Sequence, residues 1–184
     1  MVLILVIVLS FTIPNFLNYR QNSIITNDCT LEQLKSNHVF RKCDFSNMDL
    51  SYRDLEGINL VLSNFQGANL KGINLSHAIL DANNFDGVDL EDANLQSAVL
   101  QGSSLKNANL KNSNLSWSYA TNANFSHTNL ENANFYNASL AGTDFSNSNL
   151  LNANFTGVSL YTRDGFRMIN WNNCSGFYLC TQLN

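Results

Sequence analysis

A leucine or phenylalanine stands at almost every fifth position from Phe45 to Leu160, and this spacing constrains the fold more than any other feature of the chain. Of the 24 positions in the series, 16 are Leu, 7 are Phe and the single exception is Ala120. An α-helix would need apolar residues at about every 3.6 positions, and a half-exposed strand would need them at every second position. A strict period of five instead predicts a repeat protein, in which every unit supplies one buried side chain to a shared core.

Two positions beside each Leu or Phe also repeat. Two residues earlier, 17 of the 24 sites hold Ala, Ser, Thr or Cys, which suits a narrow and densely packed interior. Immediately before the Leu or Phe, 18 of the 24 sites hold Asn or Asp, which favour turns and local hydrogen bonds. Phe recurs at every fourth pentapeptide, at 45, 65, 85, 125 and 145. We therefore predict that four pentapeptides make one coil, and that the whole series makes six coils.

The repeated motif resembles that of the pentapeptide-repeat family, A(D/N)LXX. The copies that carry the resemblance are Ala68-Asn69-Leu70, Ala93-Asn94-Leu95, Ala108-Asn109-Leu110, Ala123-Asn124-Phe125, Ala133-Asn134-Phe135 and Ala153-Asn154-Phe155. The resemblance covers residues 43–162 and implies an all-β fold, a right-handed quadrilateral β-helix. The four faces also follow from the recurrence of Phe at every fourth pentapeptide, whereas the handedness is implied by the resemblance alone.

The chain divides into four predicted segments: 1–19, a signal peptide or membrane anchor; 20–42, a linker and capping helix; 43–162, the β-helix; and 163–184, a C-terminal cap. The apolar run from Val2 to Ile13 has the length of a secretory signal, although no Lys or Arg precedes it and no Ala-x-Ala site follows. Three interpretations stay open: a cleaved signal peptide, which we favour, an uncleaved anchor, or an apolar start without a targeting role. Either of the first two predicts an exported protein (periplasmic, secreted or membrane-anchored) rather than a cytoplasmic one.

Both ends of a solenoid need covering, because its terminal strand edges would otherwise pair with other chains. Thr30 and Gln33 have the spacing of a capping box, which predicts a short helix from about Leu31 to Val39. Arg53 falls at an inward position of the first coil, so we expect it to reach the open end and pair with an acid or a carbonyl. From Tyr161 onwards the period is lost, and the apolar residues there are expected to cover the last coil. We expect no loop between the coils.

Four cysteines flank the repeat, two on each side. An even number at the two ends predicts two local disulfides, Cys29–Cys43 and Cys174–Cys180, which agrees with export. A metal site is a weaker interpretation, since the two pairs should lie at opposite ends and no His completes a tetrahedral set. Reduced structural cysteines are the third alternative, above all at Cys43.

Residues four pentapeptides apart should stack along the rod, so the sequence predicts three surface ladders. The first, here the charged ladder, alternates in sign over four members and comprises Ser51, Lys71, Glu91, Lys111, Glu131 and Leu151. The second, the amide ladder, predicts hydrogen bonds along the rod and comprises Asp54, Asn74, Asn94, Asn114, Asn134 and Asn154. The third, the apolar ladder, places three apolar residues where Asn is usual and comprises Asn59, Ile79, Val99, Tyr119, Ser139 and Ser159.

The apolar ladder is the best candidate for an interface, because contiguous exposed apolar area on a soluble protein often marks a contact surface. The predicted interface residues are Val61, Leu62, Ile79, Val99, Trp117 and Tyr119. An equally weighted alternative is that Tyr119 turns inward and fills the space left by Ala120.

No catalytic set accompanies the repeat. The three histidines, His38, His77 and His127, fall on the cap or on separate outward positions, and the acids from Asp81 to Asp92 should form a solvated belt around one coil. We therefore predict no catalytic, cofactor-binding or metal-binding residues. A net charge of −4 argues against a nucleic-acid-binding surface.

The sequence thus predicts a non-catalytic, exported structural or protein-interaction scaffold, whose partner is another protein or a second copy of the chain. The alternative comes from the resemblance, since some pentapeptide-repeat proteins mimic DNA and act as inhibitors or protectors of type II topoisomerases. Lys71, Lys106 and Lys111 interrupt the acidic surface that such a mimic needs.

Overall fold

The structure is a computed structural model of the 184-residue chain. It describes residues 25–26, 29, 34, 39–162, 165–166 and 169–176.

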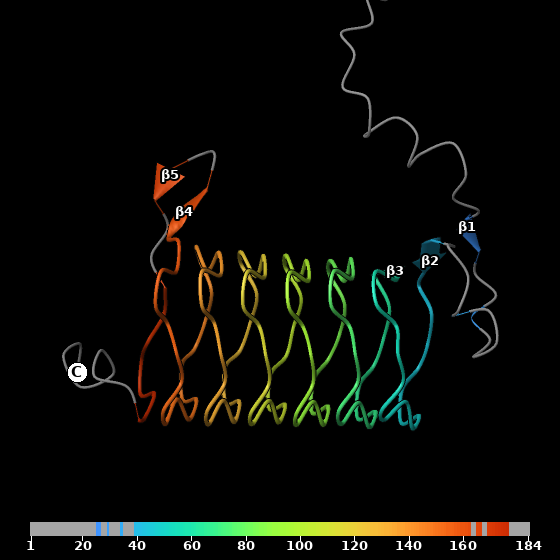
Figure 1. The fold of residues 1–184 in the computed structure, drawn as a ribbon, viewed down its shortest axis with the longest axis horizontal. Helices are drawn as coiled ribbons and strands as arrows, with labels where there is room; N and C mark the ends of the chain where they lie inside the picture. Colours follow the sequence, from blue (N-terminus) through green and yellow to red (C-terminus); the bar gives the residue numbers. More distant parts are fainter. Residues whose placement is uncertain are drawn as a thin grey trace, which may run out of the picture.

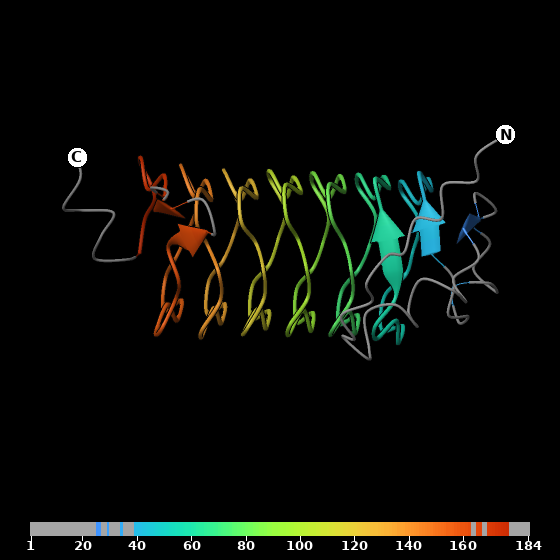
Figure 2. The ribbon, with the colours of Figure 1, turned by 90° about the horizontal axis from the view of Figure 1, so that it is seen from above.

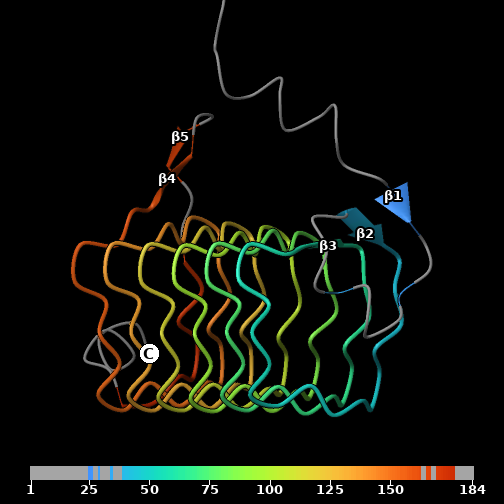
Figure 3. The same ribbon diagram turned by 45° about the vertical axis from the view of Figure 1, so that its right-hand side comes forward.

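The molecule is a stack of coils in which each coil pairs with the next (Figures 1 and 3). The residue before each inward Leu or Phe forms a parallel bridge with its counterpart four pentapeptides later, so four ladders of bridges run along the stack. Three of them begin at Asp44↔Asn64, Asp49↔Asn69 and Asp54↔Asn74, and the fourth continues the strand pairing Val39↔Asn59 through Asn59↔Ile79. This register is that of the four-pentapeptide coil predicted from the sequence.

The described residues include five short strands, which lie at or near the two ends of the stack. At the N-terminal end, β1 (Ile25–Thr26), β2 (Val39–Arg41) and β3 (Asn59–Val61) form a parallel sheet in that order, in which Val39 pairs with Asn59 and Ile25 with Val39. At the other end, β4 (Tyr161–Thr162) and β5 (Gly165–Phe166) form an antiparallel hairpin. Figure 2 looks onto the side of the stack where β2 and β3 lie next to each other and where the β4–β5 hairpin stands out at the far end.

The Leu and Phe side chains fill the axis of the stack. All of them from Phe45 to Leu150 are buried, while Phe155 and Leu160 near the end are partly exposed. Rings one coil apart lie parallel, with centroids 5.0 Å apart for Phe45 and Phe65 and 4.8 Å apart for Phe65 and Phe85. The predicted inward column of large side chains is therefore confirmed.

The corners of the coil impose a second, backbone requirement. The residue two positions after the inward Leu or Phe adopts a left-handed conformation, with a positive φ, throughout the repeat. Gly and Asn hold most of these corners because they tolerate this conformation, which costs other residues about 1–2 kcal/mol. Bulkier side chains nevertheless stand at some corners, among them Tyr52 (φ 56°), Leu62 (φ 57°) and Trp117 (φ 61°).

The paired region is longer than the predicted repeat at both ends. Val39 lies in β2 and not in the predicted capping helix; of the rest of that helix only Leu34 is described, and it is buried. At the C-terminal end, Asp144 pairs with Asn170 and Asn149 with Ser175, a spacing of 26 instead of 20. Residues 169–176 therefore rejoin the stack after six extra residues.

One expectation about this end was wrong: a hairpin, β4–β5, is inserted before a last partial coil, where no loop between coils was expected (Figure 1). The period is lost after Leu160, as expected, although residues 169–176 pair with the stack again. The rejoining segment escaped the period-five pattern because Trp171 takes the place of Leu or Phe. Its ring stacks on Phe145 with centroids 5.0 Å apart, and Cys174 takes the next buried small-residue position.

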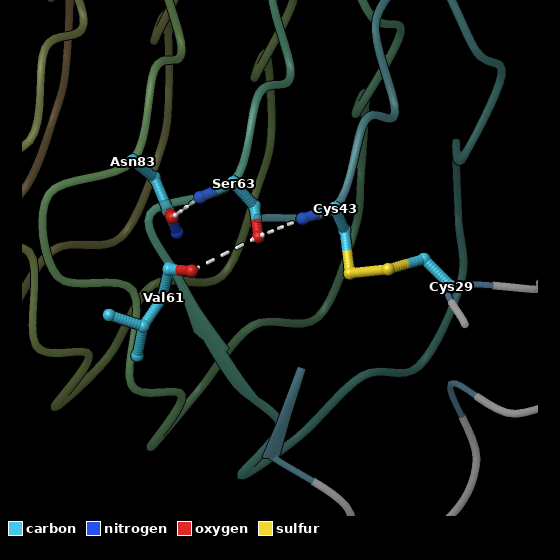
Figure 4. The surroundings of a disulfide bond; sticks show 5 residues. All are labelled: Cys29, Cys43, Val61, Ser63 and Asn83. Atoms are coloured by element: carbon cyan, nitrogen blue, oxygen red, sulfur yellow. Dashed lines mark hydrogen bonds between the residues drawn. A yellow bond between two sulfur atoms is a disulfide. The ribbon is translucent and has the colours of Figure 1, made fainter. Parts of the chain in front are cut away.

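A disulfide joins Cys29 to Cys43 at the N-terminal end, as the sequence predicted (Figure 4). It terminates an interior polar column, defined here as Cys43, Ser63, Asn83 and Ser103, all of which are buried. Within the column, each backbone N–H donates to the side chain one coil later: Cys43 to Ser63 Oγ at 3.2 Å, Ser63 to Asn83 Oδ1 at 2.7 Å, and Asn83 to Ser103 Oγ at 3.1 Å. The buried polar groups of this column are thus hydrogen-bonded.

Cys174 is also disulfide-bonded. Its predicted partner, Cys180, lies outside the described residues, as does the predicted signal or anchor segment 1–19. In the part of the chain that the structure describes, no helix has the length and apolar character of a membrane span.

Candidate binding surface

The amide ladder is continuous along the described stack, as predicted. The Nδ2 group of each Asn donates to the side chain one coil earlier, from Asn74→Asp54 (2.8 Å) and Asn94→Asn74 (3.1 Å) to Asn154→Asn134 (3.0 Å). The Oδ1 atom of each Asn also accepts the backbone N–H two residues later, as Asn94 does from Gln96 at 3.2 Å. The side-chain oxygens of this ladder are therefore satisfied within the rod itself.

The charges of the charged ladder are paired with one another. Lys71 pairs with Glu91 at 3.2 Å and Lys111 with Glu131 at 3.1 Å, as the alternating signs predicted. Glu91 is the first cause of the raised pKa of Lys71, through its hydrogen bond to the ammonium group. Neighbouring opposite charges thus cancel along this side of the rod, and no extended anionic strip forms on its described coils.

The apolar ladder differs from both. Tyr119 is 59% exposed, so the alternative in which it turns inward is wrong, and Ala120 is itself fully buried. Ile79, Val99 and Val61 are half-buried, whereas Leu62 (49%) and Trp117 (52%) are exposed. The structure therefore brings Ile79, Val99 and Tyr119 together as consecutive bridged rungs, and it places Leu62 and Trp117 at the two corners that border them.

Replacing Asn by apolar residues in this ladder leaves a buried acceptor without a donor. Asn59 Oδ1 is buried and makes no hydrogen bond within the described residues. In the amide ladder the same atom would accept from the Asn one coil later, but here the next rung is Ile79. A buried unsatisfied polar group costs about 1–3 kcal/mol. The apolar ladder therefore does not improve the hydrogen bonding of the fold.

At a neighbouring corner, a backbone N–H that lacks the usual Asn acceptor finds another one. Gln101 follows Val99, which has no side-chain oxygen to accept the Gln101 N–H. Asp81 Oδ1, one coil earlier, accepts this N–H at 3.1 Å instead. Burial raises the pKa of the Asp81 carboxyl, and the Gln101 hydrogen bond opposes this shift. An ionised carboxylate here is therefore less favourable than an exposed one.

Trp117 is the most conspicuous side chain of the surface. It occupies a left-handed corner that favours Gly or Asn, and it is half-exposed. Its ring meets that of Tyr136, on the next coil, edge to face with centroids 5.8 Å apart. Sequence reasoning missed Tyr136, although it lies one position short of a full coil after Trp117 and so belongs beside the same corner.

Among the described residues on this side of the rod, none is charged over four consecutive coils. The stretches concerned, here called the neutral face, are residues 96–102, 116–122, 136–142 and 156–162. They hold Ser, Thr, Asn, Gln, Gly, Ala, Val, Leu, Tyr and Trp. Trp and Tyr give rigid contact area at a low entropic cost, while Ser, Asn and Gly give adaptable hydrogen bonds, and the same mixture is found in antibody paratopes.

The arginine and histidine residues considered in the sequence do not form a site among the described residues. Arg53 is half-buried and has no ion pair among the described residues, but its charge contributes to the lowered pKa of Asp49, which is mainly due to the hydrogen bonds from Ser51. His77 and His127 are exposed on different coils, and His38 lies outside the described residues. Across the described ranges, no group of three or more His, Cys, Asp or Glu side chains is arranged to hold a metal ion.

Family models match this repeat directly. The model described as pentapeptide repeats (8 copies) matches residues 43–81 and 58–96, and the pentapeptide repeat region model matches residues 88–163. The chain belongs to the pentapeptide-repeat family. The matches together cover residues 43–163, including the whole apolar ladder from Asn59 to Ser159, and end before the partial coil at residues 169–176.

Solved pentapeptide-repeat structures are similar to parts of this chain. The alr5209 protein of Nostoc PCC 7120 is 28% identical over 53% of this chain and 79% of its own, with a TM-score of 0.43. The AT2G44920 protein of the Arabidopsis thaliana thylakoid lumen is 23% identical over 74% and 77%, with a TM-score of 0.39. QnrB1, a plasmid-mediated fluoroquinolone resistance protein, is 22% identical over 75% and 71%, with a TM-score of 0.28. No curated protein matches the sequence.

Proposed function

We propose that this pentapeptide-repeat protein is a non-catalytic, exported scaffold that binds a partner through its neutral face. The supporting rod is a right-handed quadrilateral β-helix, whose rigid coils hold the side chains of one face at fixed spacings. Rigid presentation favours binding because few rotamers and no backbone are ordered when the partner docks. The Cys29–Cys43 disulfide supports export, since disulfides persist in oxidising compartments.

The observation that carries the proposal is the position of Trp117. A Trp in a left-handed corner costs backbone energy that Gly or Asn would avoid, and half of its surface remains in solvent. Backbone strain of this kind clusters at functional sites. Trp and Tyr are also the residues most enriched among the binding hot spots of interfaces.

The experiment is capture of partners from the exported fraction by the immobilised protein. The test variant is Trp117→Asn, and the matched control is Tyr52→Asn, which changes another exposed aromatic residue in a left-handed corner away from the neutral face. A partner retained by the parent and by Y52N but lost by W117N supports the proposal. Equal retention by all three proteins, or recovery of the intact protein only in the cytosol, contradicts it.

The alternative, a DNA mimic that acts on a type II topoisomerase, has less support. A mimic needs a continuous acidic surface, and here Lys71 and Lys111 pair with the acids of the charged ladder. Inhibition of gyrase supercoiling by the purified protein is the observation that would favour it.

A further inference from the structure

The neutral face borders a row of identical hydrogen-bond donors that the described part of the chain does not use. Each Asn of the amide ladder has two N–H donors and an oxygen with two acceptor sites. In Asn114 the oxygen accepts from Asn134 at 3.3 Å and from the Ser116 backbone at 3.1 Å, while one N–H donates to Asn94. The second N–H has no partner among the described residues, and Asn94 and Asn134 repeat this pattern.

The corner between the amide ladder and the apolar ladder therefore has three components. On one side, donors recur once per coil; on the other, Val99 and Tyr119 expose apolar surface; at the corner itself, Trp117 and Tyr136 present their rings. Neutral groups (Gln96, Ser97, Asn137 and Thr156) occupy the other corner positions on these coils. A ligand that follows this corner along the rod meets donors and aromatic faces but no charges.

The spacing of the donors discriminates between extended ligands. Neighbouring coils pair like β-strands, so the donors recur at roughly 4.8 Å. The carbonyls on one side of an extended peptide recur every two residues, or at about 6.7 Å, and would lose register with the donors within two coils. One sugar residue in an extended β-1,4-linked polysaccharide advances the chain by close to one coil. Successive residues are turned over, so a given edge of the chain presents different hydroxyls from one sugar to the next, but every residue has a hydroxyl acceptor on that edge and an apolar C–H face that stacks on aromatic rings.

The lack of charge also restricts the partner. A protein interface of standard size covers about 20–30 residues a side and has a polar rim, to which charged side chains normally contribute. The neutral face comprises 28 residues, of which eight are buried, so its surface residues reach the lower end of that range and none of them is charged. Nucleic acids and anionic polysaccharides are disfavoured as well, because their binding depends on Lys and Arg. A neutral hydroxyl-rich polymer needs no such groups.

We infer that the partner is a neutral β-linked polysaccharide, which lies along the corner between the amide and apolar ladders and stacks on the ring of Trp117, beside the nearly perpendicular ring of Tyr136. This inference rests on the proposed function, because it names the chemistry of the ligand at the same surface. Asn114 supplies the donor nearest in sequence to Trp117, and its neighbours one coil away on either side, Asn94 and Asn134, repeat the contact along the chain.

The test is titration with hexamers of β-1,4-linked glucose and of β-1,4-linked N-acetylglucosamine, followed by tryptophan fluorescence and by calorimetry. Because Trp171 is buried against Phe145, Trp117 is the exposed reporter. We expect binding by at least one hexamer, insensitivity to salt, and a loss of affinity of at least about tenfold in W117N but not in Y52N. Heparin is the anionic control and should not bind.

Three results would overturn the inference: binding of neither hexamer, binding that W117N leaves unchanged, or heparin binding that salt abolishes. Failure of the inference is distinguishable from failure of the proposed function. If the hexamers do not bind but an exported protein is retained by the parent and Y52N and lost by W117N, the polysaccharide is wrong while the scaffold function stands. If W117N affects neither experiment, both are wrong.

Discussion

The amide ladder and the apolar ladder are built on the same backbone and yet differ in what they leave unsatisfied. Asn74, Asn94 and Asn114 pass one hydrogen bond per coil along their side of the rod. On the apolar ladder the corresponding atom, Asn59 Oδ1, is buried without a donor among the described residues, and Tyr119 faces solvent. The fold therefore needs the hydrogen bonds of the amide ladder and tolerates the exposed apolar side chains of the second ladder, which remain available for binding.

The largest loss of stability is expected from core substitutions, and it should be the same behind the amide ladder and behind the apolar ladder. Leu95 lies behind the amide ladder and Leu100 behind the apolar ladder, and both are buried. Leu95→Ala and Leu100→Ala should each lower the free energy of unfolding by about 2–5 kcal/mol, because each leaves a cavity in the same axial core. Chemical denaturation of the two variants measures it. If L100A alone lost little stability, the core behind the apolar ladder would differ from the core behind the amide ladder. The two ladders could then not be compared as surfaces on a common core.

Substitutions at the surface of the two ladders should have different effects on the free energy of unfolding. Asn114→Ala removes the acceptor of the buried Ser116 N–H and breaks the ladder in both directions, so we expect a loss of about 1–3 kcal/mol. Tyr119→Ala removes an exposed side chain and should change stability by less than about 0.5 kcal/mol. Denaturation midpoints of the pair provide the measurement, and equal losses would contradict the assignment of the apolar ladder to binding.

An Asn introduced into the apolar ladder would supply the donor that Asn59 Oδ1 lacks. Ile79→Asn places a donor one coil after Asn59 Oδ1, in the arrangement of Asn74 and Asp54. Satisfying the buried acceptor should contribute about 1 kcal/mol, which offsets the loss of a half-buried apolar side chain. We therefore expect the free energy of unfolding, measured by chemical denaturation, to stay close to that of the parent. A loss of more than about 2 kcal/mol, the range of a core truncation, would show that Ile79 serves packing.

The smallest effect concerns Asp81. Since burial raises the pKa of its carboxyl, folding favours the protonated form, and the contribution present below the ordinary pKa of 3.8 is lost as the pH rises through the raised value. Asp81→Asn keeps an acceptor for Gln101 and removes the charge. It should therefore be more stable than the parent at pH 7, by no more than about 1 kcal/mol for this half-exposed group, and equal to it below pH 3.8. The pH dependence of urea unfolding checks the sign; a destabilised variant at pH 7 would contradict it.

The sequence was sufficient to predict the repeating part of the molecule. One inward Leu or Phe per pentapeptide, and Asn before it, specify the coil register, the amide ladder and the Lys71–Glu91 pair. The irregular end was not predictable in the same way. Trp171 stacks in the column but breaks the period by six residues, and a spacing of 26 is visible only when Asn170 is seen to pair with Asp144.

The candidate surface was only partly predictable for a related reason. The position of Ile79, Val99 and Tyr119 on one ladder follows from the period, but the direction of the Tyr119 side chain does not. The Trp117–Tyr136 contact joins corner positions on successive coils, and the repeat indicates their proximity without showing that the two rings meet. The backbone conformation of Trp117 likewise requires coordinates.

The central claim is that Trp117 is retained for binding and not for the fold. Unfolding free energies of a double-mutant cycle, W117N with and without Tyr136→Ser, test it most directly, because the cycle separates the ring contact from the backbone strain. We predict that W117N changes stability by no more than about 1 kcal/mol in the parent and is stabilising by about 1 kcal/mol in the Y136S background, where only relief of the left-handed strain remains. A loss of about 3–5 kcal/mol in both backgrounds, as for a core Trp, would contradict the account.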